Sequence, residues 1–348
     1  MLERTRRRAL PALFATITAS LTALLLGATV PDTPQRVARV GVFFWHRSAN
    51  DLAAFEGIQR AFSIRGLPVE FIVHHADGDE RRAREQLDAC RDAKLDLLFT
   101  MGTRATFLAQ GWVGRMPIVF TAVTNPVEAG FAKSFGTRVE RSSTLVRMTG
   151  TSNWIPPETV LHVFRLAVPK MRRLAILRSS DSGFVSAAEL KDLSTAIERS
   201  GEPLEVVEVV LDMRFGMQAA LDRVLAADVD ALWIPIDFPI YEQSAAIAEY
   251  LTGKGLPVLS SSLRATEDAA IAGVVVDYPL LGQRAAALAF AILLDEQDPQ
   301  RMPIEMMQGY QIVLNLEAAR RYGYELPLPL LAVADRVLGG ETKDRGGR

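Results

Sequence analysis

Two stretches of the chain share one pattern: RVARVGVFFWHRSAND at residues 36–51 and KMRRLAILRSSDSGF at residues 170–184. Each begins with basic residues, continues as a short apolar run and ends in polar residues that favour the start of a helix. Matched positions recur downstream at offsets of 134, 135, 134 and 140, namely Val40 and Leu174, Gly66 and Gly201, Asp96 and Asp230, and Pro117 and Pro257. The near-constant offset predicts two similar βαβαβ lobes that face each other across a cleft.

Short runs rich in β-branched and aromatic residues alternate with helix-length segments in both halves. The first half has such runs at 40–44, 69–74, 95–101 and 118–122, and the second at 174–177, 204–210, 231–236 and 258–260. The runs are nearly continuous in apolar residues, which is typical of parallel strands covered on both faces. The predicted fold class is therefore α/β, with two Rossmann-like lobes that contain parallel sheets and are joined by a hinge.

The same alternation gives domain boundaries. Lobe 1 is expected to comprise residues 37–148 plus about 272–303, and lobe 2 residues 149–271 plus about 304–335. Thr149 and Gly150 are the predicted hinge. Residues 336–348 end in GGETKDRGGR, which has nothing to bury, and we expect a disordered tail there.

The first thirty residues differ from the rest of the chain. Four arginines precede a charge-free run at residues 9–30, which is typical of an export signal. The run is also long enough to span a bilayer. The predicted location is therefore the periplasm, with residues 1–30 acting either as a cleaved signal peptide or as an N-terminal anchor through residues 9–30.

Composition and motifs argue against several functions. The net charge of −2 gives no basic excess, so we expect no nucleic-acid partner. The single cysteine, Cys90, can form no internal disulfide. G-x-G-x-x-G, P-loop, G-x-S-x-G and H-E-x-x-H motifs are absent, and adjacent His74 and His75 would point to opposite faces of a strand. We expect no enzyme, no cofactor and no metal, and a monomeric protein.

Candidate ligand-binding residues follow the predicted strands, because ligands of open parallel sheets bind beyond the carboxyl ends of the strands. Free backbone N–H groups at the following helices favour a ligand carboxylate. Asp181 or Asp237 would receive an ammonium group, and Trp45 or Phe238 would cover an apolar or aromatic part. Simple helix capping is the alternative role for each Ser, Thr, Asn or Asp. The candidates are Trp45, Gly102, Thr103, Thr124, Asn125, Ser179, Ser180, Asp181, Ser182 and Asp237.

Two segments carry a family resemblance: MPIVFTAVTNPVEAG at 116–130 and MTGTSNWIPPETVLHVFRLAVPKMRRLAIL at 148–177. In them the chain resembles ABC-transporter substrate-binding proteins of the tryptophan/tyrosine-binding type, which have the type I periplasmic-binding-protein fold. The resemblance implies a ligand held between the lobes by the Gly102-Thr103 loop, the Thr124-Asn125 loop, the Ser179–Ser182 loop and Asp237. Arg147 departs from the family pattern, which usually has Asn there.

The expected function is an exported receptor that binds a small amino acid-like ligand, an aromatic one included, and delivers it to an ABC permease in the inner membrane. Replacing Thr124 or Asp237 by Ala is expected to weaken binding without unfolding the protein. A periplasmic sensor coupled to a membrane sensor kinase or cyclase is the alternative, and an enzyme on a doubly wound fold is a third.

Overall fold

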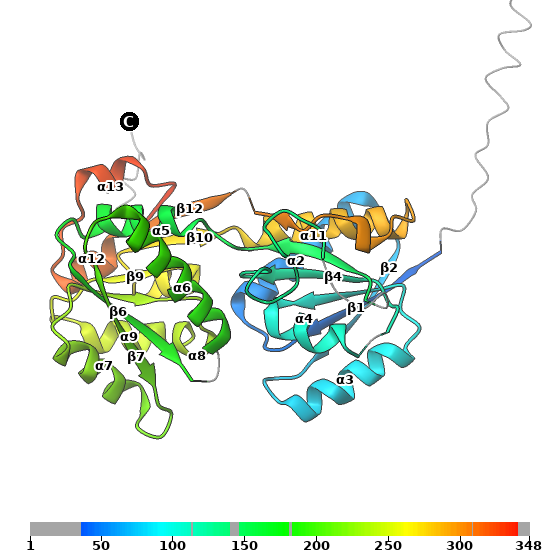
Figure 1. Ribbon diagram of the computed structural model, residues 1–348, viewed down its shortest axis with the longest axis horizontal. Helices are drawn as coiled ribbons and strands as arrows, with labels where there is room; N and C mark the ends of the chain where they lie inside the picture. Colours follow the sequence, from blue (N-terminus) through cyan, green and yellow to red (C-terminus); the bar gives the residue numbers. More distant parts are fainter. Residues whose placement is uncertain (1–35, 113, 140–145, 181–182, 308, 340–348) are drawn as a thin grey trace, which may run out of the picture. The chain divides into compact units, whose positions relative to one another are not determined.

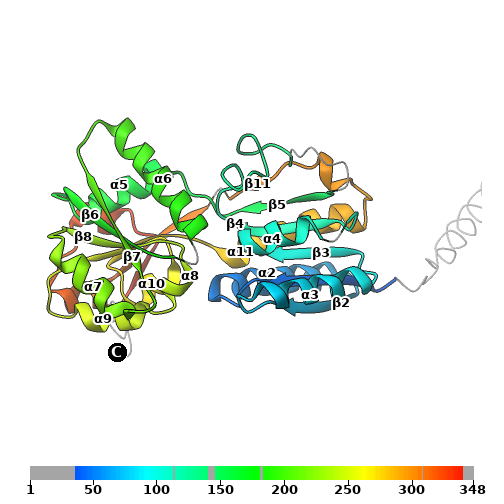
Figure 2. The ribbon, with the colours of Figure 1, turned by 60° about the horizontal axis from the view of Figure 1, so that its bottom comes forward.

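The computed structural model describes residues 36–112, 114–139, 146–180, 183–307 and 309–339. Two sheets with helices on both faces form the compact unit that begins at Ala38 (Figures 1 and 2). Among the described residues, no helix has the length and apolar character needed to cross a bilayer. Residues 1–35, which include the predicted export signal, lie outside the described part of the chain.

The first sheet has the strand order β11-β5-β4-β3-β1-β2, and its strand pairs are parallel. Helices α2 and α11 cover one face of this sheet, and helices α3 and α4 cover the other. We refer to the sheet and these four helices as the first lobe. Its strands are β1 (Ala38–Phe44), β2 (Val69–His75), β3 (Leu97–Met101), β4 (Ile118–Val123), β5 (Met148–Ser152) and β11 (Glu305–Met306). Its helices are α2 (Ala49–Arg65), α3 (Glu80–Asp92), α4 (Gly102–Gln110) and α11 (Tyr278–Leu293).

The second sheet has the order β13-β12-β10-β9-β8-β6-β7, and only the β10–β12 pair among its described strands is antiparallel. With its helices it forms the second lobe, around one hydrophobic core. Its strands are β6 (Arg173–Ser179), β7 (Glu205–Leu211), β8 (Ala231–Ile234), β9 (Val258–Ser260), β10 (Ala272–Val276), β12 (Tyr310–Asn315) and β13 (Arg336–Leu338). Its helices are α5 (Pro157–Ala167), α6 (Gly183–Ser200), α7 (Gly216–Ala226), α8 (Phe238–Tyr241), α9 (Ser244–Leu251), α10 (Leu263–Asp268), α12 (Leu316–Tyr322) and α13 (Leu328–Ala332). The α/β class is confirmed.

The sequence repeat corresponds to a repeat of side-chain contacts. At the start of β1, the guanidinium of Arg39 donates through Nε to Glu70 of β2 at 3.1 Å and also donates to the carbonyl of Ala93. The backbone N–H of Arg39 donates to the carboxylate of Asp96 at 2.9 Å. One arginine therefore ties β1 to β2 and to the loop before β3.

The second lobe has the same arrangement 134 or 135 positions later. Arg173 at the start of β6 donates through Nε to Glu205 of β7 at 3.0 Å and through its guanidinium to the carbonyl of Ala227. The backbone N–H of Arg173 donates to Asp230 at 2.8 Å. The repeat therefore includes the polar contacts that fix the strand starts, as well as the hydrophobic pattern.

The chain crosses between the lobes at points that differ from those expected. Thr149 and Gly150 lie inside β5 of the first sheet, and a Cβ on Gly150 would come 2.2 Å from the carbonyl oxygen of Phe120. Strand β10, expected in lobe 1, lies in the second sheet between β9 and β12, and β11 pairs with β5 in the first sheet. The chain therefore crosses between the lobes after β5, after β10 and after β11. The expected crossing points were wrong because an apolar strand pattern does not specify which sheet the strand joins.

The end of the described chain also differs from the expectation of disorder. Residues 336–338 form β13, an edge strand parallel to β12, with Val313 paired to Arg336. The backbone of a short edge segment gains ladder hydrogen bonds whatever its side chains, so composition alone did not predict it. Residues 340–348 lie outside the described part of the chain.

Candidate functional site

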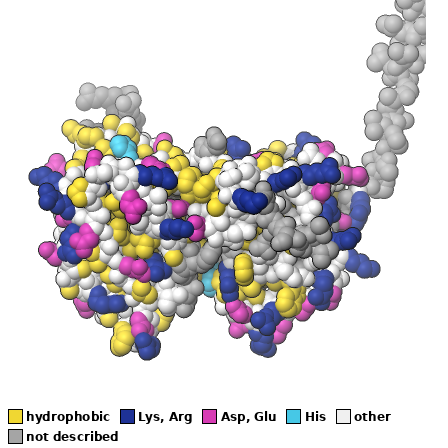
Figure 3. All heavy atoms as spheres, viewed as in Figure 1, with side chains coloured by type: hydrophobic (Ala, Val, Ile, Leu, Met, Phe, Trp, Pro, Cys, Tyr) yellow, Lys and Arg dark blue, Asp and Glu magenta, His cyan; other side chains and the backbone are white. Residues whose placement is uncertain are grey.

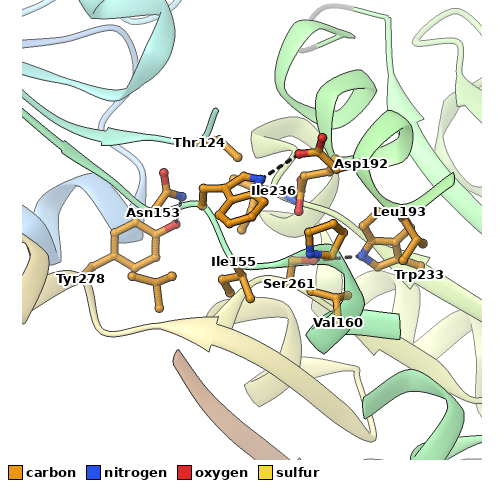
Figure 4. A pocket seen from close by; sticks show the side chains of 14 residues that line it. Thr124, Asn153, Ile155, Val160, Asp192, Leu193, Trp233, Ile236, Ser261 and Tyr278 are labelled. Atoms are coloured by element: carbon orange, nitrogen blue, oxygen red, sulfur yellow. Dashed lines mark hydrogen bonds between the residues drawn. The ribbon is translucent and has the colours of Figure 1, made fainter. Parts of the chain in front are cut away.

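A small pocket lies where the crossing segments after β5 and β10 meet helices α5 and α6 (Figure 4). Its volume is about 40 Å³, and its lining comes from both lobes. The lining residues are Thr124, Asn153, Trp154, Ile155, Pro157, Val160, Glu189, Asp192, Leu193, Trp233, Ile236, Ser261, Val276 and Tyr278.

Two crossing segments are tied to each other at this pocket. Asn153 follows β5, and its side-chain amide donates to the hydroxyl of Tyr278 at 3.1 Å. Tyr278 begins α11 after Asp277, whose carboxylate caps the helix by accepting from the backbone N–H of Leu280. Proline at the start of α5 and of α11 fits the first helical turn, where no N–H is needed. Local helix-start signals thus position the two polar side chains.

Helix α6 contributes two acidic residues three positions apart, Glu189 and Asp192, which lie on one face of the helix. Glu189 accepts a hydrogen bond from the backbone N–H of Ile236 at 2.6 Å. Burial raises the pKa of Glu189 to about 8, and the nearby carboxyl groups of Asp237 and Asp192 act in the same direction. Glu189 is therefore mainly protonated at neutral pH.

Asp192 is contacted from the first lobe by two donors. Its Oδ2 accepts from the side-chain amide of Asn125 at 3.0 Å and from the indole N–H of Trp154 at 2.9 Å. The second of these bonds is the dashed line to Asp192 in Figure 4. Next to it on α6, Lys191 pairs with Glu128 of the first lobe at 2.6 Å. The middle of α6 is thus a polar contact zone between the lobes.

The pocket is acidic and aromatic. Its described lining contains two carboxyl groups and no Lys, Arg or His, so a positively charged group is the electrostatic complement. Trp154, Trp233 and Tyr278 supply aromatic surface. The indole N–H of Trp233 is satisfied by Ser261 at 3.1 Å, which leaves its ring faces for packing.

Thr124 and Asn125 are the predicted site residues that the structure brings to this pocket. Thr124 lines it, and Asn125 reaches it through Asp192. The backbone N–H of Thr124 donates to the hydroxyl of Thr103 at 3.4 Å, so the start of α4 lies directly behind. Gly102 opens α4 with a φ of +85°, a conformation that favours glycine.

Trp45 lies apart from the pocket lining. Its ring packs against the core under α3 and α4, with the guanidinium of Arg104 5.5 Å from the ring centroid. The adjacent His46 stacks on Phe238 of the second lobe, with centroids 4.4 Å apart and planes 13° apart. Burial lowers the pKa of His46. His46 and Phe238 therefore form an aromatic contact between the lobes.

Asp237 is fully buried and does not line the pocket. Its carboxylate accepts from the backbone N–H and the hydroxyl of Ser179, at 2.9 and 2.8 Å, and from the hydroxyl of Ser186 at 2.9 Å. The group predicted to receive a ligand ammonium thus joins β6, α6 and the loop after β8. Ser180 is exposed, and Asp181 and Ser182 lie outside the described residues.

A second group of polar residues joins the start of α2 to α8. Ser48 caps α2 by accepting from the backbone N–H of Asp51 at 3.0 Å, and its hydroxyl donates to the Asp51 carboxyl at 2.8 Å. Burial raises the pKa of Asp51 to about 7. The pKa of Tyr241 is raised first by burial and next by Asp51. Two acids with raised pKa values, Asp51 and Glu189, therefore lie near contacts between the lobes.

Sequence reasoning missed most of the pocket. Asn153, Trp154 and Tyr278 belong to crossing segments that the predicted boundaries placed elsewhere, and Trp233 lies within a strand. In the sequence, Glu189 and Asp192 look like charged residues on the solvent-exposed face of a helix. Their three-residue spacing beside the buried Leu193 was the available signal.

The model of a protein family described as ABC transporter substrate binding protein matches residues 39–338. A curated relative, the tyrosine-binding protein of Clostridioides difficile (strain R20291), is 25% identical over 222 residues, which are 64% of this chain and 61% of the relative. The chain thus matches about three fifths of the length of that relative.

Solved structures show the same fold at low identity. One is the ABC domain from Streptococcus pneumoniae in complex with L-Trp, with a TM-score of 0.76, 20% identity, and 87% of this chain and 100% of that chain covered. A conserved domain protein from Vibrio cholerae gives a TM-score of 0.77 at 21% identity, with the same coverage. The fold is that of type I periplasmic binding proteins. With the family match over nearly the whole described chain, this protein belongs to the ABC transporter substrate-binding protein family.

Proposed function

We propose that this protein is the exported receptor of an ABC importer and takes an aromatic amino acid between its lobes. The observation that carries the proposal is the pocket lined from both lobes, with two carboxyl groups, aromatic walls and no basic side chain in its described lining. One relative is named for tyrosine, and one structural neighbour was solved with L-Trp. Both ligands combine an ammonium group with an aromatic ring.

The side chains suggest a role for each part of the ligand. Asp192 would receive the ammonium group through a charge-assisted hydrogen bond. Protonated Glu189 would add a donor or acceptor without adding charge. The backbone N–H groups at the start of α4, beside Thr103 and Thr124, would receive the carboxylate. Trp233 and Tyr278 would pack against the ring.

Ligand entry would require movement. The cavity of about 40 Å³ is far below the roughly 300 Å³ from which ligand pockets usually start. A ligand that touches both lobes only when they are closed shifts the population toward the closed form by that difference in affinity. The closed form would then be recognised by the permease in the inner membrane, and no covalent bond would be made or broken.

Export to the periplasm is part of the proposal and is supported by the basic and then charge-free sequence of residues 1–30. Lys and Arg are interspersed with Asp and Glu over the face in Figure 3, as expected of a domain surrounded by water. Neighbouring genes for a permease and an ATPase would support import, whereas a sensor kinase or cyclase gene would favour signalling.

Titration calorimetry with L-tryptophan, L-tyrosine and L-phenylalanine tests the proposal. We expect at least one of them to bind with micromolar or tighter affinity, and Asp192→Asn to weaken that binding at least tenfold. Glu198→Gln is the matched control, because Glu198 is exposed on the same helix. Failure of all three amino acids to bind wild-type protein would refute the aromatic ligand class, and an unchanged affinity in Asp192→Asn would refute the ammonium site.

A further inference from the structure

Trp154 is the pocket residue whose position the proposed function does not explain. It follows β5 in the crossing segment, where its backbone N–H donates to the hydroxyl of Ser152 at 3.1 Å. Its indole ring belongs to the pocket lining and stacks on Phe135, with centroids 4.3 Å apart and planes 29° apart. The indole N–H donates to Asp192 on α6 of the other lobe at 2.9 Å.

The chemistry of this side chain matches that of the proposed ligand. An aromatic ring occupies the region between the lobes, and an N–H donor occupies the carboxylate oxygen on which the ammonium group would depend. Asn125 donates to the same oxygen, so Oδ2 of Asp192 already accepts two hydrogen bonds. A ligand ammonium can approach that oxygen fully only when one donor leaves.

Trp154 is the donor better suited to leave. Its ring is only partly buried, and the stacking partner Phe135 has 39% of its surface exposed. Asn125, by contrast, is 4% exposed, and its side-chain oxygen accepts from the backbone N–H groups of Val127 and Glu128. If Trp154 moved away from Asp192, it would lose only a partly exposed stacking contact with Phe135. If Asn125 moved away, the hydrogen bonds to its side-chain oxygen from the backbone N–H groups of Val127 and Glu128 would also be lost.

We propose that Trp154 is an internal competitor for the ligand and thereby a specificity-determining residue. In the ligand-free protein its ring lines the pocket and its N–H donates to Asp192. A ligand is accepted when its own ammonium group and ring replace both contacts, so molecules with only one of the two groups are excluded. This inference rests on the proposed function for the identity of the ligand, and on the Trp154–Asp192 contact alone for the competition.

The rival interpretation makes Trp154 a fixed wall against which the ligand packs. The two interpretations predict opposite changes in ligand affinity when Trp154 is replaced. Removal of a competitor tightens ligand binding, because the apparent affinity is no longer reduced by the occupied fraction. Removal of a wall weakens binding, because the ligand loses aromatic contact area.

The experiment compares two variants with a matched control. Trp154→Phe keeps the ring that stacks on Phe135 and removes the N–H donor, and Trp154→Ala removes both. Trp112→Phe is the control, because the indole of Trp112 also donates to a carboxylate, that of Asp88 at 3.0 Å, outside the pocket. Calorimetry with the three aromatic amino acids should show about threefold tighter binding in Trp154→Phe, about tenfold tighter binding in Trp154→Ala and no change in Trp112→Phe.

A second readout needs no ligand. In a ¹⁵N-labelled protein, the indole N–H signal that is missing in Trp154→Phe belongs to Trp154. Asp192→Asn should shift this signal and speed its exchange with water, and Asp88→Asn should leave it unchanged. A saturating amino acid should move the Trp154 signal in the wild-type protein as the bond to Asp192 breaks.

The proposal that Trp154 competes with the ligand would be wrong if both Trp154 variants bound the ligand as tightly as wild type or more weakly. It would also be wrong if the indole N–H signal of Trp154 did not change in Asp192→Asn. Tighter binding in Trp154→Ala than in Trp154→Phe, with Trp112→Phe unchanged, would support it. If no amino acid binds any variant, the proposed ligand class fails by itself, and the response of the indole signal to Asp192→Asn then decides whether Trp154 occupies the site.

Discussion

Gly282 of α11 lies so close to Ala54 of α2 that a Cβ on the glycine would come 1.8 Å from the alanine carbonyl oxygen. Gly57 of α2 has the same relationship to the carbonyl oxygen of Pro279, at 2.0 Å. The two helices therefore pack backbone against backbone. This close contact joins a late segment of the chain to the first lobe directly after the chain leaves the second sheet.

Gly282→Ala should destabilise the protein by about 1–3 kcal/mol, because the added methyl group forces the two helices apart. The free energy of unfolding in urea measures the effect. Gly111→Ala is the control: Gly111 has ordinary backbone angles and open space around it, so a change within about 0.5 kcal/mol is expected. Equal stability of the two variants would show that α2 and α11 are not in close contact.

Asp237→Ala should cost stability, which differs from the expectation that it would weaken binding without unfolding, because Asp237 is fully buried and hydrogen-bonded. The substitution removes the carboxylate that accepts from the backbone N–H of Ser179 and from the buried hydroxyl of Ser186. Loss of such partners costs about 1–3 kcal/mol for each buried group. Thermal unfolding measures the loss, and Ser186→Ala, which removes one donor and leaves the carboxylate its other partners, should cost less.

Ser48→Ala should destabilise the protein by about 1 kcal/mol, because Ser48 caps α2 through the backbone N–H of Asp51. Ser63→Ala is the same substitution at an exposed position within that helix, where alanine is the better helix former. Urea unfolding should therefore give shifts of opposite sign for the two variants. A shared sign would contradict the capping role.

The raised pKa of the partly buried Glu189 predicts a pH dependence of stability. Its pKa is raised from 4.5 to about 8 by burial, so the folded protein binds more protons than the unfolded chain between these values. The stabilising contribution of protonated Glu189 is complete below about pH 4.5 and is lost as the pH rises through 8. The expected slope is at most about 1.4 kcal/mol per pH unit for one group.

Glu189→Gln isolates this effect, because glutamine is neutral at every pH and keeps an oxygen for the backbone N–H of Ile236. The variant should resemble the wild-type protein at pH 5 and exceed its stability at pH 8. Other titrating groups, such as Asp51, are common to both proteins and cancel in the difference. A parallel pair of pH–stability curves would show that Glu189 is ionised in the folded protein.

Much of the fold could be predicted because strand patterns and helix starts are local. The run at 258–260 coincides with β9, and the capping pattern at Ser48 marks the start of α2. The sheet to which each late strand belongs is a long-range property. Strand β10 is continuous in apolar residues and would be buried in either sheet, so its sequence did not decide between them.

The site was harder to predict because its residues are selected by tertiary contacts. Asp237 precedes α8 and Asp192 lies in the middle of α6. Hydrogen bonds within the second lobe surround Asp237, whereas Asn125 of the first lobe contacts Asp192. Only the spatial arrangement separates a structural carboxylate from one that faces the partner lobe. Thr124 and Asn125 were found because they directly follow a buried strand.

The three crossings also determine when the protein can fold during synthesis. The first lobe lacks its covering helix α11 and its edge strand β11 until about residue 307 has been made, and the second lobe lacks β12 and β13 until still later. Domains usually complete as the ribosome delivers them in order. Here neither half can complete early, so the last packing contacts of both lobes form only near the end of translation, which would keep the nascent chain incompletely folded during the proposed export.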